Sequence, residues 1–324
     1  MKTFNFNYIF LFVLIFTVLL FPAQVSAQDS IVKKTHILLL GETRVKVNVY
    51  EKNGAPVTFV APHFNERLAG KLARESIAKN GGRFVEIESF NQNGVPARQL
   101  DFNFKGKFYS IDPNRIYTAD GRRCGGYSSE IERAVKRFAD KFLKILLAPD
   151  GKSLRKGERF IIAVHNNNDV DDKAAHQKAG DLTATAFVKN IGFSRALHGA
   201  FQAQAAGAYL SNQENDQDNF VFLSSTQFIG FFVEKGFNVV VQKSASELQS
   251  GGCNTDDGSL SVFSSLADIP YICLEADAQS GGERQKRMIE SVYQLSETIG
   301  DSEVEATTHK TGNRMEEQNY KRSK

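Results

Sequence analysis

Residues 56–66, PVTFVAPHFNE, contain the strand-to-helix junction around which the rest of the chain is organised. The apolar run Pro56–Val60 predicts a buried strand, and it leads directly into Ala61-Pro62-His63. From Glu66 to Lys79, apolar residues recur at about the spacing of a helix, and Gly81-Gly82 ends the pattern. The stretch therefore predicts a strand followed at once by a helix, with polar side chains where the two meet.

The same alternation of strands and helices continues on both sides of this junction. Short apolar runs predict further strands at residues 36–40, 45–50, 83–87, 160–164, 220–223, 238–242 and 271–274. Helical spacing predicts helices at 226–235, 260–267 and 283–298, and one that begins with a capping box between Ser129 and Glu132. Several strands are apolar on both sides, so both faces of the sheet must be covered. We therefore predict an α/β protein: a single three-layer α/β/α domain with a central mixed, mostly parallel twisted sheet.

The amino terminus has the order of segments found in a secretory signal peptide. Lys2 is followed by an apolar run over residues 8–21, then by Pro22 and the small residues Val25-Ser26-Ala27. We predict cleavage after Ala27 and a secreted or periplasmic protein. An uncleaved membrane anchor is the alternative, but the apolar run is short for a bilayer span of about 20 residues.

The remaining 297 of the 324 residues are enough for one large domain, which we place at residues 28–300. The polar residues 301–324 are predicted to form a disordered tail. Without Lys2, the 40 basic residues become 39 against 37 acidic ones, and this balance predicts no nucleic-acid partner. No second apolar run is long enough to span a membrane, so we expect no membrane span in the mature chain.

The chain has three cysteines, Cys124, Cys253 and Cys273. In an exported protein this odd number allows at most one internal disulfide and leaves a free thiol. The sequence does not choose among the three possible pairings.

Two segments carry candidate metal ligands at the ends of predicted strands. His63 and Glu66 lie three residues apart at the first junction, and His165 follows the apolar run at 160–164. Imidazole nitrogen and carboxylate oxygen suit zinc, and three protein ligands with one open position are typical of a catalytic site. Each signal has a plainer interpretation: the first pair as a polar contact at a helix start, and His165 as a buried histidine.

Two further segments supply groups that such a site needs. Glu275 ends the apolar stretch from Ile269, where a partly desolvated carboxylate can act as general base. Asn114 and Arg115, within Asp112-Pro113-Asn114-Arg115, offer an amide and a planar donor fork suited to a substrate carboxylate. Alone, Glu275 would be read as a strand-end carboxylate facing solvent, and the second segment as a turn with a surface arginine.

Taken in order, these motifs resemble the zinc carboxypeptidase family, near its succinylglutamate desuccinylase and aspartoacylase branch. The family shows His-x-x-Glu after an early strand, an Asn-Arg pair often within Asp-x-Asn-Arg, and a distant His. A Gly-Ser helix start and an Ile-Pro-Tyr-like strand that closes on the catalytic Glu follow, matched here by Gly258-Ser259 and by Ile269–Glu275. The resemblance covers roughly residues 57–276 and implies a zinc carboxypeptidase-like fold.

The resemblance also implies a role for each matched residue. It makes His63, Glu66 and His165 the ligands of one zinc ion per chain, and Glu275 the general base and acid. Asn114 and Arg115 would grip the substrate carboxylate. Arg98, 17 positions before Arg115, would polarise the scissile carbonyl and stabilise its oxyanion. The implied mechanism is attack of zinc-bound water on an amide through a tetrahedral intermediate.

The sequence departs from the family at two places. Ala61-Pro62 replaces the usual Gly before the first ligand, and residues 251–254 read Gly-Gly-Cys-Asn where the peptidases commonly carry a Tyr. We expect an exported carboxypeptidase or peptide amidase that cleaves an amide next to a free carboxylate, with cell-wall or other peptides as substrates. The alternatives are a desuccinylase-type deacylase of N-acyl amino acids, and a peptide-binding module that has lost catalysis.

Overall fold

The computed structural model describes residues 30–147, 160–167, 204–209, 211 and 219–298, and the described residues from Ile31 onward belong to one compact unit. The predicted signal peptide, the predicted tail and most of the polar region between His165 and Asn219 lie outside the described residues. Within the described part, no helix has the length and apolar character needed to cross a membrane.

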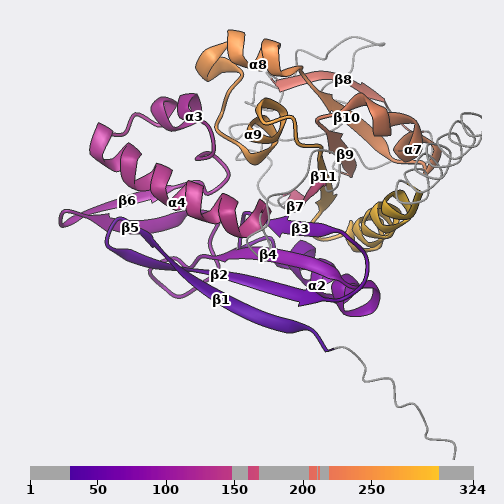
Figure 1. Cartoon of the computed structure of the whole chain (residues 1–324), viewed down its shortest axis with the longest axis horizontal. Coiled ribbons are helices and arrows are strands. Elements are labelled where there is room, and N and C mark those ends of the chain that lie inside the picture. Colours follow the sequence, from indigo (N-terminus) through magenta and orange to yellow (C-terminus); the bar gives the residue numbers. More distant parts are fainter. Residues whose placement is uncertain (1–29, 148–159, 168–203, 210, 212–218, 299–324) are drawn as a thin grey trace, which may run out of the picture. The chain divides into compact units, whose positions relative to one another are not determined.

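Among the described residues, nine strands form one mixed sheet in the order β1-β2-β4-β3-β7-β11-β9-β10-β8 (Figure 1). Their bounds are β1 (Val32–Leu40), β2 (Thr43–Lys52), β3 (Thr58–Ala61), β4 (Gly82–Glu88), β7 (Ile161–Asn167), β8 (Ala205–Tyr209), β9 (Phe220–Leu223), β10 (Asn238–Gln242) and β11 (Tyr271–Asp277). The central strands β4, β3, β7 and β11 run parallel, and β1, β2, β8 and the β9–β11 pairing add antiparallel neighbours. The predicted mixed sheet with a parallel centre is therefore confirmed.

Helices cover both faces of the sheet, which confirms the predicted three layers (Figure 1). Their bounds are α2 (Arg67–Asn80), α3 (Ala119–Cys124), α4 (Ser129–Leu147), α7 (Ile229–Glu234), α8 (Ala245–Ser250), α9 (Leu260–Leu266) and residues 282–298. One core packs β1, β2 and the inner face of the centre against α4, through side chains such as Phe138 and Phe142. The second packs the opposite face against α2, α7 and residues 282–298, through Ile77, Phe232 and Ile289.

Several predictions of local structure differ from the fold. Residues 226–235 form a 3-10 turn (Thr226–Phe228) and the short helix α7 instead of one continuous helix. The N-terminal contact of α4 comes from Ser128, whose Oγ accepts from the N–H of Ile131 at 3.5 Å, and Ser129 is already helical. The sequence reading also missed the hairpin β5 (Leu100–Phe104) and β6 (Lys107–Ile111).

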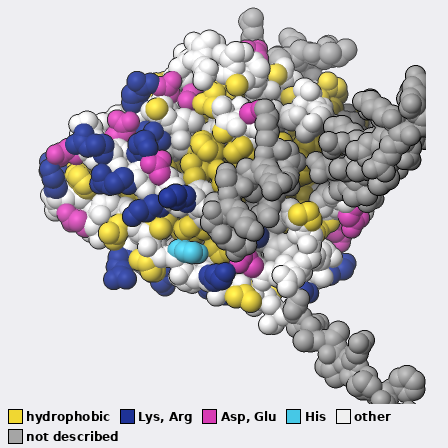
Figure 2. Space-filling view, in the orientation of Figure 1, with side chains coloured by type: hydrophobic (Ala, Val, Ile, Leu, Met, Phe, Trp, Pro, Cys, Tyr) yellow, Lys and Arg dark blue, Asp and Glu magenta, His cyan; other side chains and the backbone are white. Residues whose placement is uncertain are grey.

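The surface over α3, α4 and the hairpin carries both signs of charge. In the space-filling view, Lys and Arg side chains on this face alternate with Asp and Glu (Figure 2). Lys105 pairs with Glu130, and Lys136 with Asp140 along α4. Such exposed pairs contribute little to stability, about 0–1 kcal/mol each.

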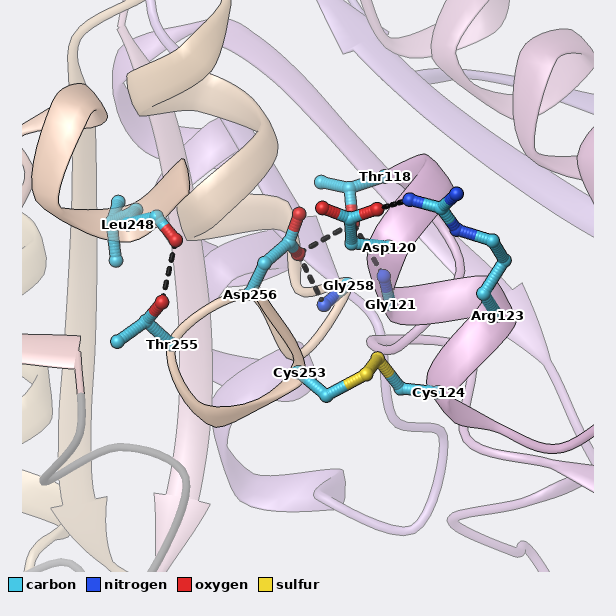
Figure 3. The surroundings of a disulfide bond; sticks show 10 residues. All are labelled: Thr118, Asp120, Gly121, Arg123, Cys124, Leu248, Cys253, Thr255, Asp256 and Gly258. Carbon is cyan, nitrogen blue, oxygen red and sulfur yellow. Dashed lines mark hydrogen bonds and ion pairs between the residues drawn. A yellow bond between two sulfur atoms is a disulfide. The ribbon is translucent and has the colours of Figure 1, made fainter. Parts of the chain in front are cut away.

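A disulfide between Cys124 and Cys253 settles the cysteine pairing, and Cys273 is a buried free thiol. The bond joins the end of α3 to the short 3-10 turn Gly252–Asn254, across 129 residues of sequence (Figure 3). It is reinforced by Asp256, whose Oδ1 accepts from the Thr118 hydroxyl at 2.5 Å. Two segments far apart in the chain are therefore cross-linked at one edge of the domain.

Removing this cross-link should lower stability without changing the fold. A disulfide that closes a loop this long typically contributes about 2–5 kcal/mol, largely by restricting the unfolded chain. We expect the double variant Cys124→Ser/Cys253→Ser to lose that amount in urea unfolding, and the reduced wild type to match it. Equal stabilities for oxidised wild type and double variant would contradict the expectation.

Candidate metal centre

Three neighbouring segments bring the predicted ligands to one end of the parallel strands. His63 lies two residues after β3, and Glu66 is the residue that precedes the first turn of α2. His165 and Glu275 lie within β7 and β11, each two residues before the strand ends, and they face each other in the register of that parallel pair. The sequence placed both residues at strand ends, and the strands continue slightly beyond them.

The Glu66 carboxylate lies between the two histidines. Its Oε1 is 2.8 Å from Nδ1 of His63, and its Oε2 is 2.8 Å from Nδ1 of His165. The two imidazole rings meet edge to face, with centroids 5.1 Å apart. All three side chains are at most 5% exposed. Burial alone would raise the pKa of Glu66, but the two histidines outweigh it and hold that pKa well below its usual range.

The donor set of these residues fits a zinc ion. One ligand atom from each of His63, Glu66 and His165 lies within 4.8 Å of the other two. Two imidazole nitrogens and one carboxylate oxygen are a common zinc-binding set, and three protein ligands leave a position for water or substrate. Each histidine points its Nδ1 at the shared carboxylate, so one nitrogen of each ring faces the place where these atoms converge.

Asp112 holds the His63 ring in place, a role that was not predicted from the sequence. Its Oδ1 lies 2.9 Å from Nε2 of His63, so the ring nitrogen opposite Glu66 has a carboxylate partner. Metal-bound histidines usually have such a partner, which fixes the tautomer and the ring orientation. Asp112 Oδ1 also accepts from the N–H of Asn114 at 2.7 Å. The sequence contained a signal for this role of Asp112, because Asp112 is the first residue of the Asp-x-Asn-Arg motif.

A buried amide network holds the second histidine and Glu66. Asn166 donates its N–H to Glu66 Oε2 at 3.4 Å, and its Oδ1 accepts from the N–H of Ala69 at 2.8 Å. Its Nδ2 donates to Oε1 of Gln285 at 2.9 Å, and Gln285 Nε2 donates to the His165 carbonyl at 2.8 Å. Asn166 thereby ties β7 to the start of α2, and Gln285 joins this network from residues 282–298. No spacing pattern in the sequence marks Gln285 for this position.

Glu275 is buried beside His165. Cys273, two residues earlier on the same face of β11, donates its thiol proton to Glu275 Oε1 at 3.3 Å. Burial raises the pKa of Glu275, and the nearby negative charge of Glu66 adds to that shift, although His165 opposes it. A carboxylate with a raised pKa is better suited to accept and return a proton near neutral pH.

Arg98 lies at the partly exposed side of this cluster. Its Nη1 donates to Glu66 Oε1 at 3.1 Å, and its Nε donates to Asp112 Oδ2 at 3.3 Å. The side chain is 39% exposed, in contrast to Glu66, which is buried. The structure therefore brings Arg98 to the candidate metal centre, although only its distance from Arg115 in the sequence had suggested it.

Asn114 and Arg115 lie next to the start of α9. Asn114 Oδ1 accepts from the N–H of Leu260 at 3.0 Å, and its side chain is buried. Arg115 is partly exposed; its Nη1 donates to the Asn114 carbonyl, and its Nε lies 3.2 Å from Oδ2 of Asp257. Burial acts against the charged guanidinium, but Asp257 and Asp112 outweigh it and raise the pKa of Arg115.

A close backbone contact holds the segment that carries Asn114 and Arg115 against the residues just before α9. Gly258 adopts a φ of +79°, and its N–H donates to Asp256 Oδ1 at 2.9 Å (Figure 3). A Cβ on Gly258 would lie 2.5 Å from the Arg115 carbonyl oxygen, and a Cβ on Gly121 would lie 2.0 Å from the Gly258 Cα. Only glycine allows the α3 segment and the start of α9 to approach this closely.

Comparison with known proteins finds no matching family model and no curated protein of similar sequence. Several solved structures align with most of this chain. A Ruegeria pomeroyi ectoine utilization protein, EutE (DoeB), has a TM-score of 0.39 and 13% identity over 86% of this chain and 70% of its own. Bovine thrombin-activatable fibrinolysis inhibitor, in complex with tick carboxypeptidase inhibitor, has a TM-score of 0.36 and 11% identity over 93% and 98%.

The third structure is a Shewanella amazonensis protein provisionally assigned as a metallopeptidase, with a TM-score of 0.33 and 10% identity over 82% of this chain and 85% of its own. The Shewanella protein is thus provisionally a metallopeptidase, and the bovine protein was solved with a carboxypeptidase inhibitor. Because all three TM-scores are below 0.5, neither the fold nor the site is inferred from these likenesses.

Alanine substitutions at two glycines test whether the close backbone contact at Gly258 constrains the folded state. Gly106 has a similar φ of +73°, but a Cβ there meets nothing within 4 Å. We expect Gly106→Ala to cost about 1 kcal/mol through backbone strain alone. Gly258→Ala should cost roughly 1–3 kcal/mol more, because its methyl group also collides with the Arg115 carbonyl. Equal losses in thermal unfolding would show that the contact is not tight.

Metal analysis tests the candidate centre directly. Purified wild type supplied with zinc should hold about one ion per chain, and His63→Ala should lose it because an open-sided site has only three ligands. Asp112→Asn should weaken zinc binding about 10–100-fold, as expected for the partner of a ligand histidine. Asp140→Asn, which removes an exposed carboxylate on α4, is the matched control and should bind zinc like wild type. Zinc-free wild-type protein at neutral pH would contradict the assignment.

Proposed function

We propose that the protein is a zinc-dependent hydrolase that cleaves an amide bond next to a free carboxylate. The observation that carries the proposal is the placement of buried Glu275 opposite His165, on the strand beside the convergent set of His63, Glu66 and His165. A metal site of three ligands combined with a neighbouring buried carboxylate is one arrangement that can hydrolyse an unactivated amide.

A zinc ion held by these three residues would polarise the substrate carbonyl and lower the pKa of a bound water to about 7. Glu275 would take a proton from the attacking water and return it to the leaving amine. Its raised pKa favours both transfers, because the group accepts a proton readily and releases it again near neutral pH. The Cys273 thiol, which donates to Oε1, leaves the other carboxylate oxygen for this exchange.

Two arginines would handle the negative charges of the substrate. Arg98 is partly exposed beside the ligands, so its guanidinium could stabilise the charge that develops on the carbonyl oxygen. Arg115 would bind the substrate carboxylate, because it is cationic and its side chain is partly exposed. Asn114 uses its amide oxygen to hold the start of α9, so only its amide hydrogens would be offered to substrate.

The two leading substrate classes share this chemistry. A peptide with a free carboxyl terminus and an N-acyl amino acid both place a carboxylate next to the scissile amide. The predicted signal peptide favours peptides, cell-wall peptides among them, because acyl amino acids are cytoplasmic metabolites. We therefore propose an exported carboxypeptidase or peptide amidase and keep the deacylase as the second candidate in the substrate test.

The general-base role predicts a specific defect in Glu275→Gln. The amide keeps the size of the side chain but cannot accept the proton, so turnover should fall about 10²–10⁴-fold. Zinc content should remain that of wild type, because Glu275 is not one of the three proposed ligands. Turnover at the wild-type rate in a zinc-loaded Glu275→Gln variant would show that the base lies elsewhere.

The substrate class follows from comparing free and blocked carboxylates. Wild type should hydrolyse peptides with a free carboxyl terminus and fail on their amidated forms. Arg115→Met should lower kcat/KM for the free acids about 10–100-fold, the effect of losing a hydrogen-bonded charge partner, and leave the amidated forms unchanged. Faster hydrolysis of N-acyl amino acids than of peptides would select the deacylase. Zinc and peptide binding without any turnover would instead identify a binding module.

A further inference from the structure

Cys273 has no role in the proposed metal centre, yet it lies against it. It is the one free thiol of a chain with three cysteines, and it is buried. A free buried cysteine usually behaves as a small hydrophobic residue. Here, however, Sγ faces a carboxylate, with Glu275 Oε1 at 3.3 Å.

The strand pairing places His165 beside Cys273 and Glu275. Cys273 and Glu275 are two residues apart on β11, so their side chains point to the same face, and His165 is the register partner of Glu275 on β7. One ligand atom each from His165, Cys273 and Glu275 lies within 4.8 Å of the other two, and all three residues are buried. The chain therefore holds a second convergent set of donors, nitrogen, sulfur and oxygen, that shares His165 with the first set.

The two sets differ in the cations they prefer. The set with His63 and Glu66 has only nitrogen and oxygen donors, whereas the second has a sulfur. Thiolate ligands select softer metal ions, and carboxylate and imidazole are less selective. We propose that His165, Cys273 and Glu275 form a second, alternative cation position that captures soft thiophilic ions such as Cd²⁺.

Metal binding at this position removes the thiol proton of Cys273 and involves no oxidation or reduction. The S–H bond of Cys273 breaks, a sulfur–metal bond forms, and the proton passes to the buffer. Because Glu275 becomes a ligand in the same step, it can no longer accept a proton from water. Occupation of the second position should therefore inhibit hydrolysis, a consequence that rests on the proposed function.

Cadmium titration followed by ultraviolet absorption tests the position without a substrate. A cadmium–thiolate bond gives a charge-transfer band, and the single free thiol makes its source unambiguous. Wild type should develop a saturable band that is lost in Cys273→Ser, which keeps a small polar side chain. His63→Ala should keep the band, because it removes a residue of the first set only.

Three results would overturn the proposal: no band in folded wild type whose thiol titrates after denaturation, a band that persists in Cys273→Ser, or a band lost in His63→Ala. The outcome is separable from that of the proposed function. If zinc-loaded wild type fails to hydrolyse any substrate while the cadmium band behaves as expected, only the function fails. If hydrolysis depends on Glu275 but no cadmium band forms, only the second position fails.

Discussion

The buried carboxylate of Glu66 imposes the constraint on which the local structure depends. A charged carboxylate inside a protein is costly unless charge partners and hydrogen bonds compensate for lost water. Here His63, His165 and Arg98 surround it, and the Asn166 N–H donates to it. These groups come from two parallel strands and the loops around them. β3, β7 and the start of α2 must consequently meet at one point, and a small slip of any of them would leave the charge uncompensated.

The supporting contacts extend this constraint outward. Asp112 fixes the far side of His63, and Gln285 holds both the His165 carbonyl and Asn166. Residues 282–298 therefore do more than cover a sheet face, because they connect two of the segments that carry the centre. Gln285, distant in sequence, thus holds β7 and, through the Leu274 carbonyl, β11. This kind of support is common around metal sites, where residues behind the ligands set their orientation.

The sequence predicted those parts of the fold that depend on local pattern. Apolar runs located the central strands, and the Pro56–His63 junction correctly preceded α2, which begins within one residue of its predicted start. The hairpin β5–β6 was missed although residues Leu100–Phe104 alternate between apolar and polar, the period of a half-buried strand, and Gly106 follows in the turn. In the site, motif order brought together residues that the structure also groups. Gln285 and the role of Cys273 depend on long-range packing, which no local spacing records.

The proposed metal ligands and the proposed carboxylate subsite are held by different means. The ligands depend on strand register and buried hydrogen bonds, whereas the subsite depends on a disulfide and on backbone contacts between the α3 segment and the start of α9. Cys253 occupies the neighbourhood where the resembling peptidases commonly carry a tyrosine, and its cross-link fixes that segment to α3. If Arg115 binds the substrate carboxylate as proposed, that carboxylate must reach a guanidinium that is already paired with Asp257. Because Asp257 shares the charge of Arg115, the proposed subsite would favour ligands whose carboxylate can approach the partly exposed Arg115 side chain without displacing this internal partner.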